Sequence, residues 1–281
     1  MKLVRYGEPG VEKPGLIGPG GEVLDLSGVV DDIMPNMLAE AALARIAGTD
    51  LGTLKPVPDN PRLGPPIAQV GKIVCVGLNY ADHAAKVGAP LPAEPQIFLK
   101  ATSAIAGPDD PIVRPRGSEK LDHEVELAVL FGRETRYVDE AEALDHVAGY
   151  LLMNDVSERA FQMEHGGGTT KGKSADSFAP LGPWLVTRDE IPDPGNLRLW
   201  TKVNGTLVQD SSTSQLVFGV ARLIAYLSRF MSFRPGDILS TGTPAGVGHG
   251  RKPPRYLKPD DIVELGIDGL GAQRHRVLQA E

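Results

Sequence analysis

Three carboxylates carried by two apolar stretches are the groups in this chain whose type and spacing suit chemistry. Glu124 and Glu126 lie within residues 121–130, a β-compatible run that is apolar toward its end and stops at a glycine. Residues two apart in a strand point to the same face, so the two carboxylates would be neighbours. A second apolar run, residues 147–155, ends in Asp155. Three carboxylates on strands, without a competing His or Cys cluster, indicate a hard divalent cation, Mg²⁺ or Mn²⁺. The alternative, and the more common fate of such a pair, is a solvated sheet face.

The candidate base is His83. It lies in residues 79–88, which predict a short helix with Asn79 as its N-cap and Gly88 as its stop. A helix that follows an apolar strand is a usual place for a catalytic group. A surface histidine fits this segment equally well.

Two predicted strands end in polar side chains. Lys100 closes residues 96–100 and is either a substrate contact or an exposed cation. Residues 237–248 predict a strand that runs into a tight Gly/Pro loop, where Thr243 can offer its hydroxyl and backbone N–H to a carboxylate.

A polar helix and a Gly-rich loop follow the second carboxylate strand. Residues 156–165 favour a helix, in which Arg159 and Gln162 share one face. Residues 166–176 predict a Gly-rich loop that contains Lys173. This loop lacks the spacing of a phosphate-binding loop, but a flexible basic segment can close over an anion.

The composition limits the class of protein. The 281 residues carry a net charge of -7 and no basic run of the kind that binds nucleic acid. The single cysteine, Cys75, lies in an apolar strand, so neither a disulfide framework nor a nucleophile is expected. No signal peptide and no membrane-spanning run is apparent, so we expect a cytoplasmic protein that binds neither nucleic acid nor membrane.

The arrangement of elements predicts a mainly β, α+β protein. A high content of glycine and proline, 33 and 24 residues, indicates many turns between short strands. Residues 1–65 predict a small N-terminal α+β domain with a helix at 37–47, and residues 66–281 predict the catalytic domain. Within the latter, residues 215–230 favour the longest helix, and Asn204-Gly205 predicts a type I′ hairpin.

Over about residues 70–281 the chain resembles the fumarylacetoacetate hydrolase superfamily. The resemblance is carried by several segments in the same order: Gly77-Leu-Asn-Tyr-Ala-Asp-His83, His123-Glu-Val-Glu-Leu127, Asn154-Asp-Val-Ser-Glu-Arg159, Lys171-Gly-Lys-Ser-Ala-Asp176 and Ser240-Thr-Gly-Thr-Pro-Ala-Gly-Val-Gly248. Residues 252–261 look like the branch that hydrolyses 2,4-diketo-3-deoxy sugar acids of the L-fuconate or L-rhamnonate type. That branch is often labelled ureidoglycolate lyase, but no residue supports ureidoglycolate cleavage.

The resemblance implies a mixed β-sandwich roll with a small N-terminal domain, forming a homodimer or larger homo-oligomer. It places Mg²⁺ or Mn²⁺ on Glu124, Glu126 and Asp155. The implied substrate is a small 2,4-diketo acid: water attacks C4, the C3–C4 bond breaks, and the products are pyruvate and a hydroxy acid such as lactate.

The resemblance also implies roles for the other candidates. His83 matches the histidine that activates water, and Lys173 matches the lysine that supports the developing negative charge. Arg159 and Gln162 match substrate-facing positions, and Thr243 matches the loop that holds the substrate carboxylate.

Two positions depart from the family pattern. Lys86 stands where many hydrolytic members have a glutamate that orients the histidine, and a cation pointing inward would weaken that base. Gly168 and Thr169 stand where the branch has larger residues, which would widen the pocket. Weak water activation would favour oxaloacetate decarboxylation or a 5-carboxymethyl-2-hydroxymuconate-type isomerisation on the same metal. A catalytically silent metal-binding or structural dimer is the third hypothesis, and the intact set of Glu124, Glu126, Asp155 and Lys173 argues against it.

Overall fold

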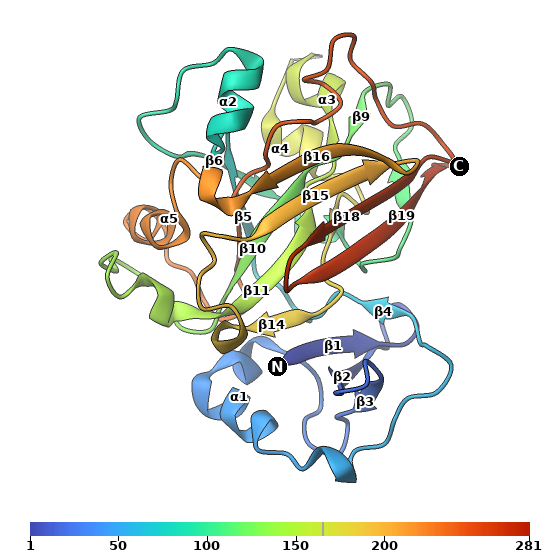
Figure 1. Cartoon of the computed structure of the whole chain (residues 1–281), viewed down its shortest axis with the longest axis vertical. Coiled ribbons are helices and arrows are strands. Elements are labelled where there is room, and N and C mark those ends of the chain that lie inside the picture. The colour runs from blue at the N-terminus through green and yellow to red at the C-terminus, as the bar shows by residue number, and fades with distance from the viewer. Residues whose placement is uncertain (165) are drawn as a thin grey trace.

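The computed structural model describes residues 1–164 and 166–281. Its largest element is a ten-stranded mixed sheet (Figure 1). In spatial order the strands are β3 (Val23–Asp25), β2 (Lys13–Ile17), β1 (Lys2–Tyr6), β14 (Leu185–Thr187), β11 (Val147–Asn154), β10 (Val125–Phe131), β17 (Ile238–Ser240), β5 (Ile73–Gly77) and β6 (Gln96–Lys100), with β4 (Leu63–Gly64) paired to β1. The β17–β5 pair is parallel and the others are antiparallel. The last strand in this order, β6, is an edge strand that pairs only with β5.

A second, five-stranded sheet packs against the first. It contains β16 (Thr206–Ser212), β15 (Arg198–Val203), β18 (Ile262–Ile267), β19 (Gly271–Gln279) and β8 (Ile112–Arg114). Contacts of β10 with β15 and β18 join the two sheets, which gives a sandwich with a shared apolar core. Two short pairs complete the strands: β9 (Leu121–Asp122) with β12 (Ser157–Glu158), and β7 (Ile105–Ala106) with β13 (Ala179–Pro180).

The helices are short and lie outside the sheets. They are α1 (Glu40–Ala47), α2 (Ala81–Val87), α3 (Arg159–Met163), α4 (Thr169–Lys173) and α5 (Val220–Leu227), with 3₁₀ turns at Pro35–Leu38, Leu51–Thr53, Thr102–Ala104, Ala143–His146, Arg188–Glu190 and Thr213–Gln215. In Figure 1, α2, α3 and α4 gather at the upper end of the molecule, beside β6 and β9. The predicted mainly β, α+β class is confirmed.

The centre of the large sheet is built from β10 and β11, in which every residue is buried. A strand that is buried on both faces reads as an apolar run, and both sequences are apolar except for Glu126 in β10 and Asn154 at the end of β11. The two strands pair in antiparallel register from Val125 opposite Asn154 to Phe131 opposite Val147. This register fixes where the carboxylates at the ends of the two strands lie. Cys75 is also fully buried, in β5, as predicted.

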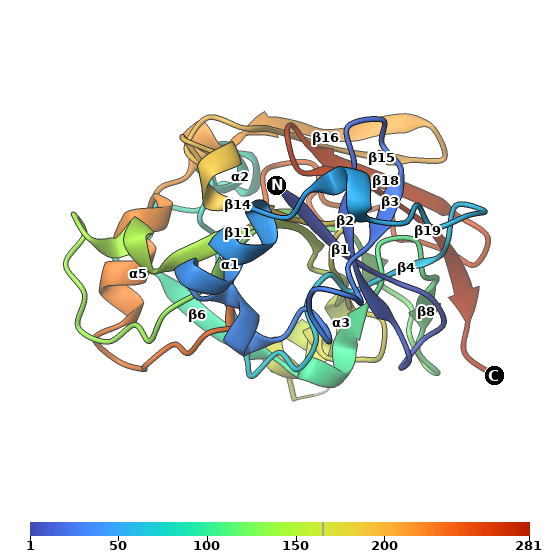
Figure 2. The ribbon, with the colours of Figure 1, turned by 90° about the horizontal axis from the view of Figure 1, so that it is seen from below.

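The N-terminal strands continue the large sheet, because β1 pairs with β14. Figure 2, seen from below, shows β1 to β3 and α1 at this end of the molecule. Residues 1–65 contain β1 to β3 and the predicted helix, which a 3₁₀ turn precedes. The segment therefore extends the sheet, while a domain boundary near residue 65 stays a prediction.

Several predicted helices differ from the observed ones. The helix expected at 215–230 is confined to α5. The side chain of Asn79 bonds both the N–H and the carbonyl of Phe218, so Phe218 makes no helical hydrogen bond and the helix begins after it. Asn79 is therefore not the N-cap of α2, whereas Gly88 ends that helix with a φ of 73°. Residues 143–146, between β10 and β11, form the 3₁₀ turn at Ala143–His146.

The segment predicted as helix at 156–165 begins as β12 and continues as α3, and His165 lies outside the described residues. The predicted Gly-rich loop contains α4. The Asn204-Gly205 hairpin is confirmed, with φ values of 50° and 75° at the two turn residues.

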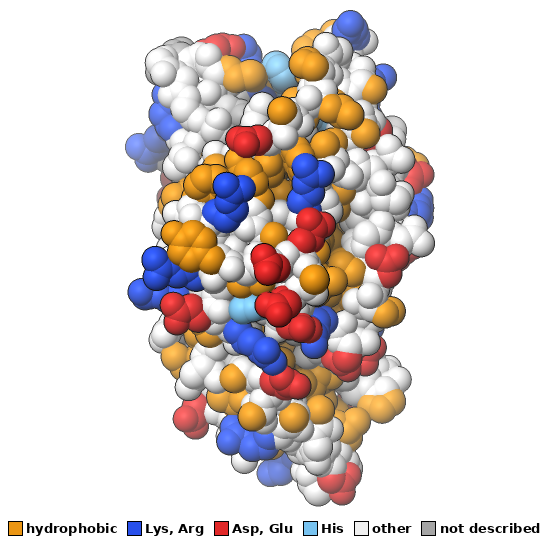
Figure 3. Space-filling model, turned by 90° about the vertical axis from the view of Figure 1, so that its left-hand side faces the viewer, with side chains coloured by type: hydrophobic (Ala, Val, Ile, Leu, Met, Phe, Trp, Pro, Cys, Tyr) orange, Lys and Arg blue, Asp and Glu red, His pale blue; other side chains and the backbone are white. Residues whose placement is uncertain are grey.

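The surface carries both signs of charge. On the face in Figure 3, acidic and basic side chains are intermixed over small hydrophobic areas. In the described part of the chain, no helix is long and apolar enough to cross a membrane.

Candidate metal centre and active site

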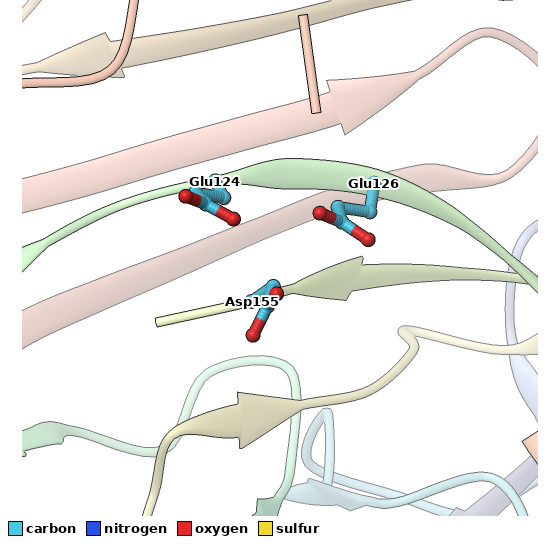
Figure 4. A group of neighbouring side chains, drawn as sticks. All are labelled: Glu124, Glu126 and Asp155. Atoms are coloured by element: carbon cyan, nitrogen blue, oxygen red, sulfur yellow. The ribbon is translucent and has the colours of Figure 1, made fainter. Parts of the chain in front are cut away.

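Glu124, Glu126 and Asp155 meet where β10 and β11 come together (Figure 4). Glu124 immediately precedes β10, Asp155 immediately follows β11, and the Asp155 N–H donates to the Glu124 carbonyl at 2.8 Å. One ligand oxygen from each of the three residues lies within 4.8 Å of the others. All three residues are buried, with 6%, 2% and 0% of their surface exposed. The antiparallel register thus converges three acids from distant parts of the sequence on one point.

Three cations neutralise two of these acids. The Lys173 ammonium lies 2.7 Å from Oε2 of Glu124 and 2.5 Å from Oδ2 of Asp155. Arg159 holds the other oxygen of Glu124 at 2.5 Å, and Lys100 holds Oδ1 of Asp155 at 2.5 Å. Burial alone would raise the pKa of Glu124, but Lys173 and Arg159 outweigh it and lower the pKa to about 2.

Lys173 stays a cation in this setting. Burial alone would lower the pKa of its ammonium, but Asp155 and Glu124 outweigh it and raise the pKa above its usual value. Lys173 is therefore suited to stabilising negative charge and unsuited to accepting a proton.

Glu126 is the acid whose charge the chain leaves unbalanced. Within the described residues no cation lies at ion-pair distance from it, and hydrogen bonds from Ser240 Oγ (2.6 Å) and the Gly242 N–H (3.0 Å) reach only Oε2. Burial, followed by the negative charges of Asp155 and Glu124, raises the pKa of Glu126 well above its ordinary value. Three convergent carboxylates with one uncompensated charge fit a hard divalent cation, which would hold Glu126 ionised.

A glycine shapes the backbone that holds Glu126. Gly242 has a φ of 102°, and an added Cβ would lie 3.1 Å from the Val76 carbonyl oxygen and 3.0 Å from Asn79 Cβ. The Gly242 N–H can therefore point at Glu126 only because the residue has no side chain.

Two of the three acids, Glu124 and Glu126, line a cavity of about 340 Å³. Its walls include five residues that the sequence proposed as catalytic or substrate-binding: His83, Arg159, Gln162, Lys173 and Thr243. A polar, enclosed site of this size beside an acidic cluster suits a small molecule with several oxygens.

The helix α2 brings His83 to this cavity. Asp82 fastens α2 to β16 and to the loop after β17, because it accepts hydrogen bonds from Ser211 Oγ (2.7 Å) and the Ala245 N–H (3.4 Å). The Nδ1 atom of His83 is buried and has no hydrogen-bond partner among the described residues. Lys86 is exposed, so it does not point inward against the ring.

A second glycine allows α4 to deliver Lys173. A Cβ on Gly172 would lie 2.5 Å from Cβ of Gln162, so α4 packs directly on α3 only because position 172 is a glycine. This contact places Gln162 and Lys173 on one wall. The Gln162 Oε1 atom accepts from Arg159 at 3.1 Å, and Gln162 lines the cavity.

A family model described as the C-terminal part of fumarylacetoacetate (FAA) hydrolase matches residues 72–278. This chain belongs to the fumarylacetoacetate hydrolase family. A protein of Burkholderia cenocepacia, provisionally named a hydrolase, is 53% identical over 282 residues, and each of the two chains is covered completely.

Two solved structures of the family show which chemistries its members carry. A maleylpyruvate hydrolase of Sphingobium sp. SYK-6, in complex with manganese(II) and pyruvate, has a TM-score of 0.84 and 30% identity. A 5-carboxymethyl-2-hydroxymuconate delta-isomerase of Mycobacterium smegmatis has a TM-score of 0.78 and 33% identity. Both comparisons cover 100% of each chain. The family fold expected from the sequence is thereby confirmed.

Two proposed substrate contacts have different surroundings from those expected. Lys100 is neither exposed nor on the cavity wall: its ammonium is fully buried behind Asp155 and also donates to the Val156 carbonyl. We therefore correct its role to that of an internal ion-pair partner. Thr243 does line the cavity, but its hydroxyl already donates to the Val125 carbonyl and accepts from Gln209.

The sequence analysis did not identify Asp122 as a site residue. It is fully buried, pairs with Arg159 at 2.9 Å and accepts the N–H groups of Gly248 and His249. Burial would raise the pKa of Asp122, but Arg159 outweighs it and lowers the pKa. Asp122 thus aims the guanidinium at Glu124. Its place two residues before a carboxylate pair was the available signal.

Proposed function

We propose that this protein is a metal-dependent hydrolase that cleaves the C3–C4 bond of a 2,4-diketo acid. The proposed substrate is a 2,4-diketo-3-deoxy sugar acid of the L-fuconate or L-rhamnonate type, and the products are pyruvate and a hydroxy acid such as lactate. The observation that carries the proposal is the buried carboxylate triad, two members of which line the same cavity as Lys173 and His83. The family member in complex with manganese(II) and pyruvate supports it.

In this proposal Glu124, Glu126 and Asp155 hold a Mg²⁺ or Mn²⁺ ion. The ion supplies Lewis-acid polarisation of the 2-oxo acid end of the substrate. Lys173 adds a permanent positive charge beside the same point, and the amide of Gln162 can donate to a substrate oxygen. Arg159 acts on Glu124 and Asp122 and so orients the acids.

The bond changes then follow from the placement of His83. A water oxygen bonds to C4 while its proton passes to the His83 imidazole. The C3–C4 bond breaks, and its electron pair stays on the three-carbon fragment as the enolate of pyruvate. Lys173 stabilises that charge, and protonation at C3 completes pyruvate.

One observation favours a second candidate function. The Nδ1 atom of His83 has no acid partner among the described residues, and the exposed Lys86 supplies none. An imidazole without an acid partner is a weaker base for activating water. Oxaloacetate decarboxylation, or an isomerisation of the kind named for the Mycobacterium smegmatis relative, needs the same charge stabilisation but no attacking water.

A pyruvate-coupled assay with added Mg²⁺ or Mn²⁺ separates the two candidates. It offers a 2,4-diketo-3-deoxy sugar acid, acetylpyruvate and oxaloacetate side by side. Hydrolysis predicts pyruvate plus an equimolar second acid from the first two, lost with EDTA and in Glu126→Gln. It also predicts that His83→Ala slows hydrolysis by roughly 100-fold or more.

The same assay states what would reject the proposal. Turnover of oxaloacetate alone, unchanged in His83→Ala, would establish the second candidate. A Lys86→Glu variant provides a further check, because an acid at this position should speed hydrolysis and leave decarboxylation unaffected.

A further inference from the structure

A second cavity, larger than the one beside the acids, lies between α1 and the large sheet; in Figure 1, α1 lies below β11 and β14. This α1 cavity has a volume of about 500 Å³, and its walls come from α1, the start of β11 and the 3₁₀ turn at Arg188–Glu190. Among the described residues, none lines both cavities. Val147 on its wall is roughly 23 Å along β11 from Asn154, the last residue before Asp155. The α1 cavity is therefore separate from the metal centre.

The floor of the α1 cavity is apolar and buried. It is formed by Leu16, Leu38, Ile46, Val147 and Ala148, each with 6% or less of its surface exposed. Side chains of this kind give water no hydrogen-bond partners, so the floor favours an apolar group over solvent. A phenyl ring with a short alkyl chain fits easily within this volume.

The arginines at the rim of the α1 cavity are already paired with acids. Arg133 lies 2.5 Å from Glu40, and Arg188 lies 2.7 Å from Asp145. Both pairs are exposed, and each joins one cation to one acid of the rim. The two arginines are thus not available to neutralise a further acid or to attract an anionic ligand.

The rim has one acid more than it has cations. The ammonium at the N-terminus lies 3.2 Å from Glu190. Among the described residues of the rim, Asp189 is then the acid without a cation at ion-pair distance. A hydrogen bond with the Thr187 side chain lowers the pKa of Asp189, so it is a carboxylate at neutral pH. The rim therefore complements a positive charge.

We propose that the α1 cavity binds a small amine with an apolar body. The ring or alkyl chain lies on the floor, and the ammonium lies at the rim beside Asp189. A carboxylate on the same body would instead face an acid that no cation balances. This binding site does not depend on the proposed function, because it shares no residue with the metal centre.

Three ligands with one phenylbutyl body test the charge preference. Calorimetry on the full-length protein compares 4-phenylbutylamine, 4-phenyl-1-butanol and 5-phenylpentanoate at pH 7.5, where the amine and the acid are ionised. A buffer of low ionic strength, about 20 mM, limits screening of the exposed rim. We expect the amine to bind about fivefold or more tightly than the carboxylate, with the alcohol between them, because contacts of exposed charges are modest.

Matched variants of α1 test the place of binding. Ala44 and Ala41 are both exposed on this helix, but only Ala44 lines the cavity. Ala44→Trp puts a large ring into the space and should weaken binding of 4-phenylbutylamine by about tenfold or more, whereas Ala41→Trp should leave it unchanged. Ala47→Trp, also exposed and lining, repeats the test if Ala44→Trp does not fold.

A variant of the rim tests the role of the unpaired acid. Asp189→Asn should weaken binding of the amine by about threefold and leave the alcohol unchanged. The control Asp31→Asn removes an exposed acid that does not line the cavity and should change neither ligand.

Each outcome supports or overturns the proposal. It is overturned if the amine does not bind, if the alcohol or the carboxylate binds at least as tightly as the amine, or if Ala44→Trp and Ala41→Trp bind the amine equally well. The expected order of the three ligands, reduced by Ala44→Trp and Asp189→Asn alone, supports it. Neither result bears on pyruvate release at the metal centre.

Discussion

Replacing Lys100 with methionine tests the charge arrangement beneath the metal centre. The ammonium of Lys100 and the carboxylate of Asp155 are both fully buried and 2.5 Å apart. Lys100→Met keeps most of the side-chain volume and leaves Asp155 paired only with Lys173. Breaking a buried pair from one side costs about 3–5 kcal/mol, which lowers the Tm of a protein of this size by roughly 6–10 °C.

The metal should recover part of this loss. Removing a positive charge beside the triad raises the affinity of the remaining acids for a divalent cation. Mn²⁺ at about 100 times its Kd adds about 2.7 kcal/mol to the stability of any folded protein that binds it only when folded. We therefore expect Mn²⁺ to raise the Tm of Lys100→Met more than that of the wild type at the same concentration.

Thermal unfolding in EDTA and in Mn²⁺ measures both effects at pH 7.5. Lys86→Met is the matched control, because Lys86 is exposed and its loss should change stability by less than about 0.5 kcal/mol. If Lys100→Met unfolds in EDTA at the wild-type temperature, the buried pair does not contribute as argued, and the reasoning is refuted. If Mn²⁺ raises the Tm of Lys100→Met and of the wild type equally, only the argument that the lost charge strengthens metal binding is refuted.

Three other predictions concern single residues. Glu126→Gln should weaken Mn²⁺ binding, measured by calorimetry, by more than the roughly 10–100-fold typical of an outer-shell partner. The control Glu119→Gln changes an exposed acid and should leave Mn²⁺ binding unchanged. Equal Mn²⁺ affinities of Glu126→Gln and the wild type would remove Glu126 from the ligand set. Burial lowers the pKa of His275 to about 4 despite the opposing effect of Asp110. The free energy of unfolding should therefore fall by about 3 kcal/mol as the pH drops from 6.5 to 4. An NMR titration that shows a protonated ring at pH 6, between the Asp110 and Gln273 oxygens, would contradict this. Burial raises the pKa of the Cys75 thiol well above its usual value, so a thiol reagent should modify Cys75 only after unfolding, and rapid labelling of the native protein would show the prediction wrong.

The sequence predicted correctly the features that depend on a single strand and its own residues. The apolar runs at β10 and β11 predicted two buried strands, and the carboxylates at their ends predicted the cluster that the structure brings together. What the pattern did not reveal is the break at His123 and Glu124. Asp122 pairs with β12 and Val125 with β11, so one apparent strand serves two partners. Pairing partners lie far along the chain, and alternation cannot reveal them.

Tertiary contacts decided the features that were missed. Lys100 ends its strand at the buried acid Asp155, and nothing in the local sequence distinguishes that position from an exposed one. The helix α4 forms within a Gly-rich segment of poor helix propensity because Gly172 allows close packing on α3. In both cases the decisive neighbour is remote in sequence.

The position of β6 at the edge of the sheet has a consequence for evolutionary divergence. The reactive acids lie in or directly beside β10 and β11, strands with neighbours on both sides, where most substitutions disturb packing and are removed by selection. Gln96 and Ile97 face the same cavity from a strand that is paired on one side only. Changes at these positions alter what the wall accepts while the hydrogen-bonded ladder stays intact. New substrate preferences can therefore arise through single, nearly neutral substitutions at the edge, and lineages with different substrates can inherit one unchanged reactive centre.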